Sequence, residues 1–207
     1  MAFVLVGGFP MRKFLLAAAL IAGLTAPAFA DPLMDGGNFY QEGDYAHALT
    51  AWQPLAAQGN AEAQNNLGLL YLDGKGVPRN LPEAVHYFQL SAAAGSALGQ
   101  NNLGGLYRDG NGLPRDFAKA VRWFAASASQ GNSAGMYNLG LMYELGQGVK
   151  ADPIAAAMWY DLAAEQKDVP NAAAHRDTLM GQMAPINRTR VQQMAVACRL
   201  SGYKNCR

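Results

Sequence analysis

The sequence predicts an all-α solenoid built from antiparallel helix pairs. Two observations lead to this fold class. One set of residues recurs three times at a spacing of 36 positions, and alanine and glycine are abundant while threonine and isoleucine are few. Recurrence at such a spacing is typical of repeat architectures, and small residues favour closely packed helices over strands. The 207 residues are enough for one ordinary domain or one short repeat array.

The recurring residues define three units, 61–96, 97–132 and 133–168. Each unit contains Asn-Leu-Gly, a tyrosine three residues later, a Gly-x-Gly, and an alanine followed by an aromatic pair. So many coincidences in one register indicate tandem copies of one structural element. The corresponding residues are Leu67, Leu103 and Leu139; Gly68, Gly104 and Gly140; Tyr71, Tyr107 and Tyr143; Ala84, Ala120 and Ala156.

The first half of each unit is predicted to be an α-helix that ends at the Gly-x-Gly. Leu67 and Tyr71 are four positions apart, so they share one face of this first helix. A glycine inside a helix costs about 1 kcal/mol relative to alanine, so the recurrence of Gly68 indicates close approach of a neighbouring helix. Gly74 and Gly76 can adopt a positive φ, which ends the helix.

The second half of each unit is predicted to be a second helix with a polar cap at its start. Asparagine and aspartate fit this place because their side-chain oxygens accept hydrogen bonds from the first free N–H groups. The helix ends at a glycine such as Gly95 or Gly131, but Lys167-Asp168 stands at the next equivalent place, so the array is expected to change geometry there. The predicted caps are Asn80, Asp116 and Asp152.

Atypical segments flank the three units. Residues 31–60 are predicted to form a partial repeat, with a shortened first helix from Leu33 to Glu42 and a second helix that ends at Gly59. Residues 169–207 are predicted to form two capping helices, around 170–183 and 186–200, and a tail. A single helix pair cannot bury its own apolar face, so stacking of neighbours must supply the core.

The N-terminus is typical of a secretory signal peptide over residues 1–30. Arg12 and Lys13 precede the apolar run 14–24, and Ala28-Phe29-Ala30 fits a signal peptidase, with cleavage after Ala30. Met11 is an alternative start, and an uncleaved anchor is the alternative to cleavage. The apolar run is shorter than the ~20 residues of a membrane span. The prediction is a periplasmic or secreted protein without stable membrane insertion after cleavage.

The two cysteines, Cys198 and Cys206, lie close together near the C-terminus. In an oxidising compartment they are predicted to form a disulfide that pins the tail. A metal site is not predicted, because zinc needs about four ligands and no histidine lies near them.

The motif Asn-Leu-Gly-x-x-Tyr-x-x-Gly-x-Gly, followed by alanine and the aromatic pair, resembles the Sel-one-like repeat family, relatives of tetratricopeptide repeats. The resemblance covers about 61–168 and the partial unit before it. It implies a right-handed α-solenoid that acts as an adaptor between proteins. Exported relatives are associated with envelope signalling, polysaccharide export and host contact. Some relatives carry a disulfide in each repeat, and the absence of cysteine from 61–168 departs from that subgroup.

The residues do not predict an enzyme or a cofactor. The histidines stand apart in the sequence, and His47 and His86 fall at positions where other units carry quite different side chains. Ser201 and Lys204 fit the Ser-x-x-Lys pattern of penicillin-recognising enzymes, which keeps a cell-wall-associated enzyme or β-lactam-binding protein as the alternative. The partner motifs of such enzymes are missing from the sequence. A formal net charge of +1 gives no footprint for nucleic acid.

The remaining candidate for a functional site is a concave groove lined by the first helices. This groove would bind a protein or peptide partner of the cell envelope. The repeated asparagines either hydrogen-bond an extended peptide or bridge neighbouring helices, and the sequence leaves both readings open. The protein is expected to be a monomer. The predicted groove residues are Asn65, Asn66, Leu69, Leu72, Asn101, Asn102, Arg108, Tyr137, Asn138, Leu141 and Glu144.

Overall fold

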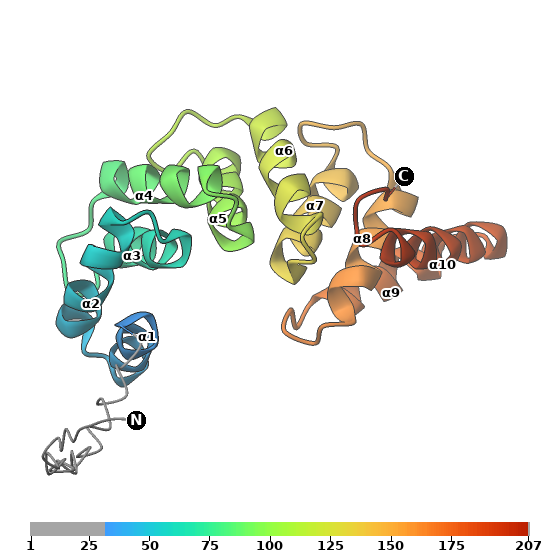
Figure 1. The fold of residues 1–207 in the computed structure, drawn as a ribbon. Coiled ribbons are helices and arrows are strands. Elements are labelled where there is room, and N and C mark those ends of the chain that lie inside the picture. The colour runs from blue at the N-terminus through green and yellow to red at the C-terminus, as the bar shows by residue number, and fades with distance from the viewer. Residues whose placement is uncertain (1–31, 207) are drawn as a thin grey trace, which may run out of the picture. The chain divides into compact units, whose positions relative to one another are not determined.

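The computed structural model describes residues 32–206, so the predicted signal peptide, the start at Met11 and the cleavage after Ala30 lie outside the described residues. Over 32–206 the structure is α-helical without a strand, which confirms the predicted α-solenoid (Figure 1). None of the described helices is long and apolar enough to cross a membrane. The helices are α1 (Pro32–Glu42), α2 (Tyr45–Ala57), α3 (Ala61–Asp73), α4 (Leu81–Ala93), α5 (Ala97–Asp109), α6 (Phe117–Ala128), α7 (Ser133–Leu145), α8 (Pro153–Ala164), α9 (Ala172–Gln182) and α10 (Pro185–Leu200).

The helices stack in chain order from α1 to α9, each packed against the next. The first helices also contact one another directly, α3 with α5 and α5 with α7, whereas the second helices α4, α6 and α8 have no comparable contacts. First helices therefore form the inner side of the stack and second helices the outer side, as Figure 1 shows.

Glycines end the first helices as the sequence predicts. Gly74, Gly110 and Gly146 have φ angles of 71°, 74° and 64°, and each N–H donates to a carbonyl of the last helical turn. This left-handed conformation is open to glycine without a steric penalty. The second glycine of the motif is a packing residue, because a Cβ on Gly76 would lie 2.8 Å from the backbone of Tyr45.

The glycine inside each first helix lets an aromatic ring approach. A Cβ on Gly68 or Gly104 would lie 2.7 Å from the ring of Phe88 or Phe124. Both rings are fully buried, and Tyr160 takes the same place against Gly140. The core of each unit therefore contains one buried ring between the paired helices, which is the close approach predicted from the repeated glycine.

Polar side chains fix the helix starts. The side chains of Asn80, Asp116 and Asp152 accept hydrogen bonds from N–H groups of the first helical turn, as predicted. Within a helix pair, Ser91 Oγ donates to the carbonyl of Ala61, and Ser127 Oγ repeats this bond to Ala97, both at 2.7 Å. These contacts tie the ends of α4 and α6 to the starts of α3 and α5, whereas the third unit has Ala163 at this position.

The C-terminal end departs from the repeat. Lys167 adopts a φ of 60° where the earlier units have glycine. Helix α9 continues the stack on α8, but α10 also packs on α8, where its Val191 and Ala195 are fully buried. Cys198 and Cys206 form the predicted disulfide, with 4.5 Å between their Cα atoms.

Candidate partner-binding surface

The predicted groove residues lie on α3, α5 and α7, and all except Asn65 keep part of their surface exposed. They form columns at the 36-residue spacing. One column runs from Leu69 to Leu141 with Gly105 between them, and the next runs from Leu72 through Arg108 to Glu144. The exposed sides of α1, α3, α5 and α7 are called the inner surface below. The second column changes from apolar to charged along the stack, and the first is apolar at both ends.

Asparagine pairs join neighbouring first helices on this surface. Asn102 Nδ2 donates to Asn65 Oδ1, and Asn138 Nδ2 donates to Asn101 Oδ1, both at 2.8 Å. An amide has a donor and an acceptor, so the same residue type can serve on both sides of the bond. The two bonds repeat one geometry at a spacing of one unit, and they hold α3, α5 and α7 in register.

Two of the three repeated asparagines, Asn102 and Asn138, bridge neighbouring helices, whereas Asn66 does not. Asn65 is only 2% exposed, so it lies within the helix interface, which corrects the expectation that it lines an open groove. Both amide atoms of Asn138 are engaged, because its Oδ1 also accepts a bond of 2.8 Å from Arg108 Nη1. Asn66 accepts a weaker bond of 3.3 Å from Asn65 and also faces an open hollow.

That hollow lies between α1 and α3. One part, of about 160 Å³, is lined by Gly37, Tyr40, Gln41, Trp52, Asn66 and Leu69. An adjoining part of about 300 Å³ shares Gly37, Gln41 and Asn66 and extends to Met34 and Glu62. Together they are called the inner cleft. It combines apolar walls with a few amide groups, which is the composition of ordinary ligand sites.

The sequence nominated only Asn66 and Leu69 of the inner cleft. Gly37, Tyr40 and Gln41 were missed because α1 does not carry the repeated motif. A usable signal was present in the spacing, since Gly37 and Gln41 are four apart and share a helix face. A Cβ on Gly37 would meet no atom within 4 Å, so this face of α1 is open.

The other end of the inner surface carries a polar cluster on α7, α8 and α9. Tyr160 Oη donates to Glu144 Oε2 at 2.5 Å, and His175 Nδ1 lies 3.3 Å from the same oxygen. The Tyr137 hydroxyl lies 3.3 Å from His175 Nε2. Burial, together with the bond to Glu144, raises the pKa of Tyr160 far above its usual range. Tyr160 therefore stays protonated and acts as a hydrogen-bond donor.

Arg108 connects α5 to this cluster. Its guanidinium pairs with Asp109 at 2.7 Å and reaches Asn138 on α7. The hydrogen bond with Asp109 raises the pKa of Arg108, so its charge is fixed. Sequence reasoning nominated Tyr137, Glu144 and Arg108 but missed Tyr160 and His175, which contact Tyr137 and Glu144 only after the helices stack.

The tail offers no support for acylation chemistry. Ser201 Oγ donates to the carbonyl of Cys198 at 2.7 Å and accepts the N–H of Asn205 at 3.1 Å. The hydroxyl is therefore used to close the last helical turn. Among residues 32–206 no group of three His, Cys, Asp or Glu side chains is placed to hold a metal ion.

Comparison with known proteins gives three matches. The family model described as Sel1 repeat matches residues 61–96, 97–132 and 133–168. A Sel1 repeat protein from Oxalobacter formigenes is 30% identical with a TM-score of 0.68, over 78% of this chain and 66% of that one. A protective antigen of uropathogenic Escherichia coli strains, which displays an SLR fold, is 22% identical with a TM-score of 0.57, over 83% of this chain and 46% of that one. The chain thus spans less than two thirds of either structure, and no curated protein matches it.

Proposed function

The chain belongs to the Sel1 repeat family, whose members are non-catalytic scaffolds that mediate protein–protein interaction, and from this premise we propose an exported adaptor. The adaptor binds a peptide or protein partner of the cell envelope along its inner surface and works as a monomer.

The inner cleft carries this proposal. Tyr40, Trp52 and Leu69 supply apolar walls for a side chain of the partner, and Asn66 and Gln41 supply amides for its polar groups. A small number of polar groups within an apolar hollow is enough to orient a bound segment. Trp52 Nε1 donates to the carbonyl of Leu33 at 3.3 Å, and Lys75 Nζ donates to the Tyr40 hydroxyl at 2.9 Å. These bonds tie α1 to α2 and to the turn after α3, so the cleft is preformed and binding costs little ordering.

Filling the inner cleft tests the binding site. Gly37→Phe places a ring in open space on α1, so it should occupy the cleft without disturbing the core. Affinity capture from an envelope extract with the full chain should yield a partner whose recovery falls at least tenfold with Gly37→Phe. Gly181→Phe on α9 is the matched control, because Gly181 also has open space around it. Equal recovery with both variants would rule out the inner cleft.

Export is supported by the charge and hydrophobic pattern of residues 12–30 and by the Cys198–Cys206 disulfide, since such bonds persist in oxidising compartments. Mass spectrometry of the protein expressed as the full chain should give a mature form that begins at Asp31. A protein that keeps Met1 or Met11 at its N-terminus would contradict cleavage.

A further inference from the structure

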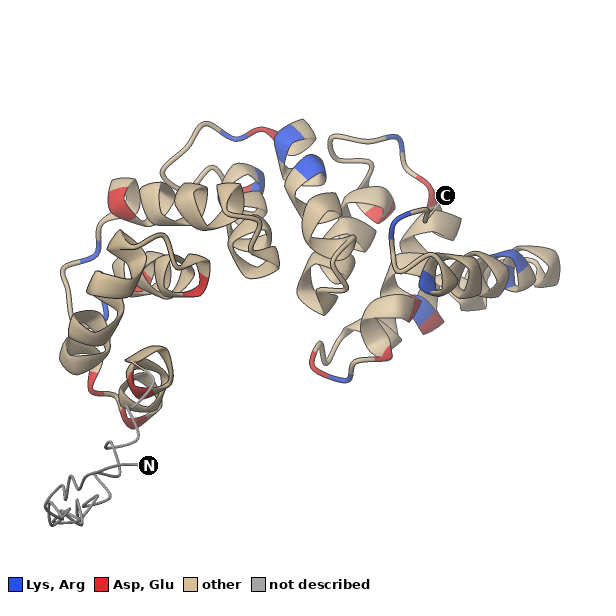
Figure 2. Cartoon of the chain, in the orientation of Figure 1, with Lys and Arg blue, Asp and Glu red and all other residues tan. Residues whose placement is uncertain are grey.

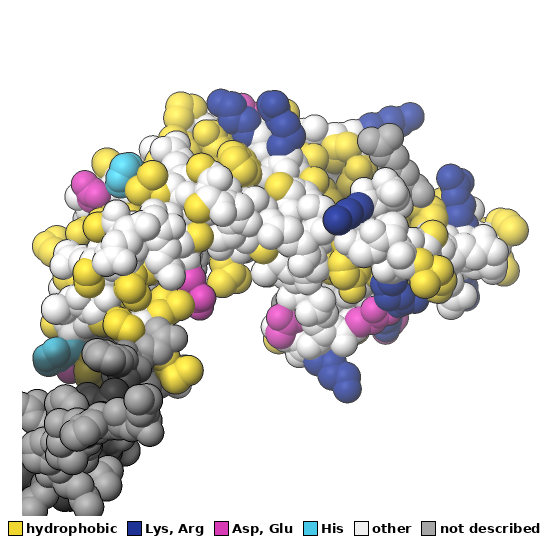
Figure 3. Space-filling view, in the orientation of Figure 1, with side chains coloured by type: hydrophobic (Ala, Val, Ile, Leu, Met, Phe, Trp, Pro, Cys, Tyr) yellow, Lys and Arg dark blue, Asp and Glu magenta, His cyan; other side chains and the backbone are white. Residues whose placement is uncertain are grey.

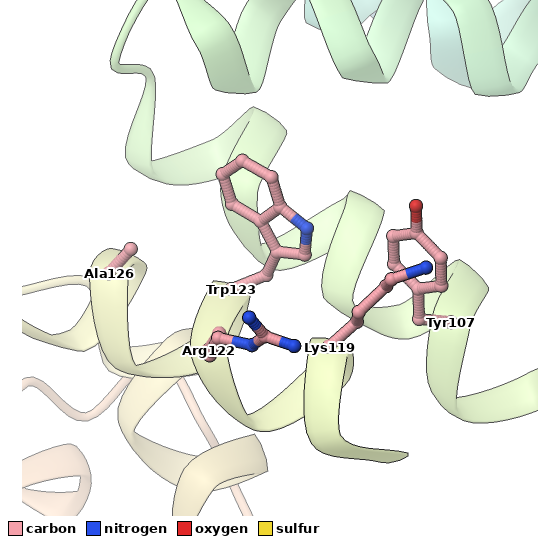
Figure 4. Close-up of a pocket in the computed structure, with 5 residues that line it drawn as sticks. All are labelled: Tyr107, Lys119, Arg122, Trp123 and Ala126. Carbon is pink, nitrogen blue, oxygen red and sulfur yellow. The ribbon is translucent and has the colours of Figure 1, made fainter. Parts of the chain in front are cut away.

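A second surface feature lies on the opposite side of the stack from the inner cleft. A cleft of about 400 Å³ is lined by Tyr107 of α5 and by Lys119, Arg122, Trp123 and Ala126 of α6. These five residues define the outer cleft, and Figure 4 shows their side chains. Positions 119, 122, 123 and 126 follow one another at helical spacing, so they occupy one face of α6.

The outer cleft combines aromatic walls with positive charge. Trp123 and Tyr107 are half-buried, and Lys119 Nζ lies 5.1 Å from the centroid of the Tyr107 ring. Figure 4 shows Lys119 reaching toward Tyr107, with Arg122 beside it. A cation held against an aromatic ring on one side can still bind an anionic group on the side that faces solvent.

Local carboxylates do not neutralise this charge. Asp116 lies 3.5 Å from Lys119, but Arg122 has no carboxylate partner among residues 32–206 and bonds only the carbonyl of Ala118. Residues 97–132 contain four basic and two acidic side chains. Figure 2 shows basic residues along the start of α6, and the space-filling view in Figure 3 shows basic side chains gathered there.

In the third unit, the α8 positions equivalent to the outer cleft are buried rather than open. One unit later, the positions of the four α6 residues are occupied by Ala155, Met158, Trp159 and Leu162, all of which are buried. Helix α10 packs on α8, and Tyr203 and Cys206 of the tail lie beside Trp159. The outer face of α8 is therefore covered by a helix of the protein itself, whereas the equivalent face of α6 is open.

Charge identifies the kind of helix that fits α6. Helix α10 packs on α8, which has Ala155 and Met158 where α6 has Lys119 and Arg122, so a segment placed on α6 in the same way would meet two positive charges. Helix α10 carries three arginines and no acidic residue, so the α10 of a second copy would be repelled there. We propose that the outer cleft binds an acidic amphipathic helix of a protein partner, placed on α6 as α10 is placed on α8.

The site is separate from the inner cleft, so the protein would hold two different partners on opposite sides of the stack. This inference does not depend on the proposed adaptor site. Gly37→Phe should leave the outer cleft unchanged, and substitutions in the outer cleft should leave capture at the inner cleft unchanged.

A charge-reversal selection tests the proposal. The probe is a displayed library of 16-residue helical peptides that keep Val, Ala and Ala at the positions of Val191, Ala195 and Cys198. The other positions are randomised among Glu, Gln and Lys. Peptides are selected on the full chain, on Lys119→Glu/Arg122→Glu, and on Lys150→Glu/Arg190→Glu. The last variant makes the same change in net charge at exposed residues elsewhere.

The expected result is a selection whose charge follows the charge of the outer cleft. The full chain and the Lys150→Glu/Arg190→Glu control should enrich acidic peptides, and Lys119→Glu/Arg122→Glu should enrich basic ones. An enriched acidic peptide should bind the outer-cleft variant at least tenfold more weakly. It should also change tryptophan emission in the full chain but not in Trp123→Phe, because Trp52 and Trp159 are buried.

Three results would overturn the proposal. One is a selection that enriches nothing. Another is enrichment of the same charge on the full chain and on Lys119→Glu/Arg122→Glu. The third is tighter binding of a 16-nucleotide thymidine oligomer than of any peptide, with the same dependence on Lys119 and Arg122, since that would make the cleft a nucleic-acid site.

Discussion

Gln64 and Gln100 occupy the same position in successive units but differ in one hydrogen bond. The side-chain Nε2 of each donates to a carbonyl eight residues earlier, Ala56 or Ala92. Gln100 Oε1 also accepts from Gln130 Nε2 at 2.8 Å, whereas the buried Gln64 Oε1 has no partner among the described residues. The reason is that Ala94 stands where the next unit has Gln130.

Ala94→Gln should therefore stabilise the protein. The new amide would donate to Gln64 Oε1, and satisfying a buried acceptor contributes about 1 kcal/mol to the free energy of unfolding. Urea denaturation would measure this gain. Ala93→Gln is the control, since it adds the same side chain at the adjacent exposed residue. An equal gain in both variants would show that the hydrogen bond is not its cause.

Tyr160 links stability to alkaline pH. Its raised pKa means that the folded protein keeps the phenolic proton at a pH where the unfolded chain releases it, near pH 10. The unfolded state then binds fewer protons, so stability falls as pH rises, by up to about 1.4 kcal/mol per pH unit. Urea denaturation between pH 9 and pH 11 should show a steeper loss for the native chain than for Tyr160→Phe. Parallel curves for the two proteins would contradict the assignment.

At the scale of the helix, two adjacent glycines of α5 have opposite roles. Gly104 faces Phe124, and an added Cβ would lie 2.7 Å from the ring. Gly105 faces the inner surface, where an added Cβ would meet nothing within 4 Å. One glycine is required by packing, and its neighbour only weakens the helix.

The two alanine variants should therefore move stability in opposite directions. Gly104→Ala forces a methyl group into the core and should lower the free energy of unfolding by about 1–3 kcal/mol. Gly105→Ala should raise it by up to about 1 kcal/mol, because alanine is the better helix former. Thermal unfolding followed by circular dichroism would compare them. A loss of stability in both variants would mean that the inner surface around Gly105 is not open.

Helix positions could be predicted from sequence because their causes are local. Caps such as Asn80 and Asp116 and glycines such as Gly74 act on the backbone within a few residues. The pairing of Asn65 with Asn102 depends on the distance between α3 and α5, and an amide alone is compatible with either role. The inner cleft was only half predicted, because its α1 wall lies outside the repeat register.

The place of α10 could not be predicted for a different reason. The sequence indicates a helix over 186–200, but it does not say which neighbour that helix covers. Helix α1 also follows a shorter spacing, since Gly36 meets Trp52 sixteen residues later whereas Gly68 meets Phe88 twenty residues later. The segments at both ends of the array do not keep the 36-residue spacing, and that spacing is what allows contacts between units to be predicted.

At the scale of the whole array over residues 32–206, the extensive helix–helix contacts are between near neighbours in the stack. Stability in such an array is a sum of unit and interface contributions, so local damage should stay local. The Cys198–Cys206 disulfide lies at one end of the array, where it pins the tail beside α8.

Removal of the disulfide should loosen only that end. Cys198→Ser/Cys206→Ser should lose about 2–3 kcal/mol of stability in the C-terminal part. Hydrogen exchange followed by mass spectrometry should show faster exchange in α10 and the tail, with α3 and α4 unchanged. Faster exchange along every helix would instead mean that the array unfolds as one cooperative unit.

The covering of α8 by α10 also bears on how such a chain can lengthen during evolution. A duplicated 36-residue segment inserted after residue 96 or 132 would meet neighbours with interfaces that the stack already contains. A segment inserted after residue 168 would separate α8 from α9 and α10 and expose the apolar side of α8. Growth by duplication is therefore favoured inside the array. The segment with α9 and α10 would stay unchanged and cover the last repeat.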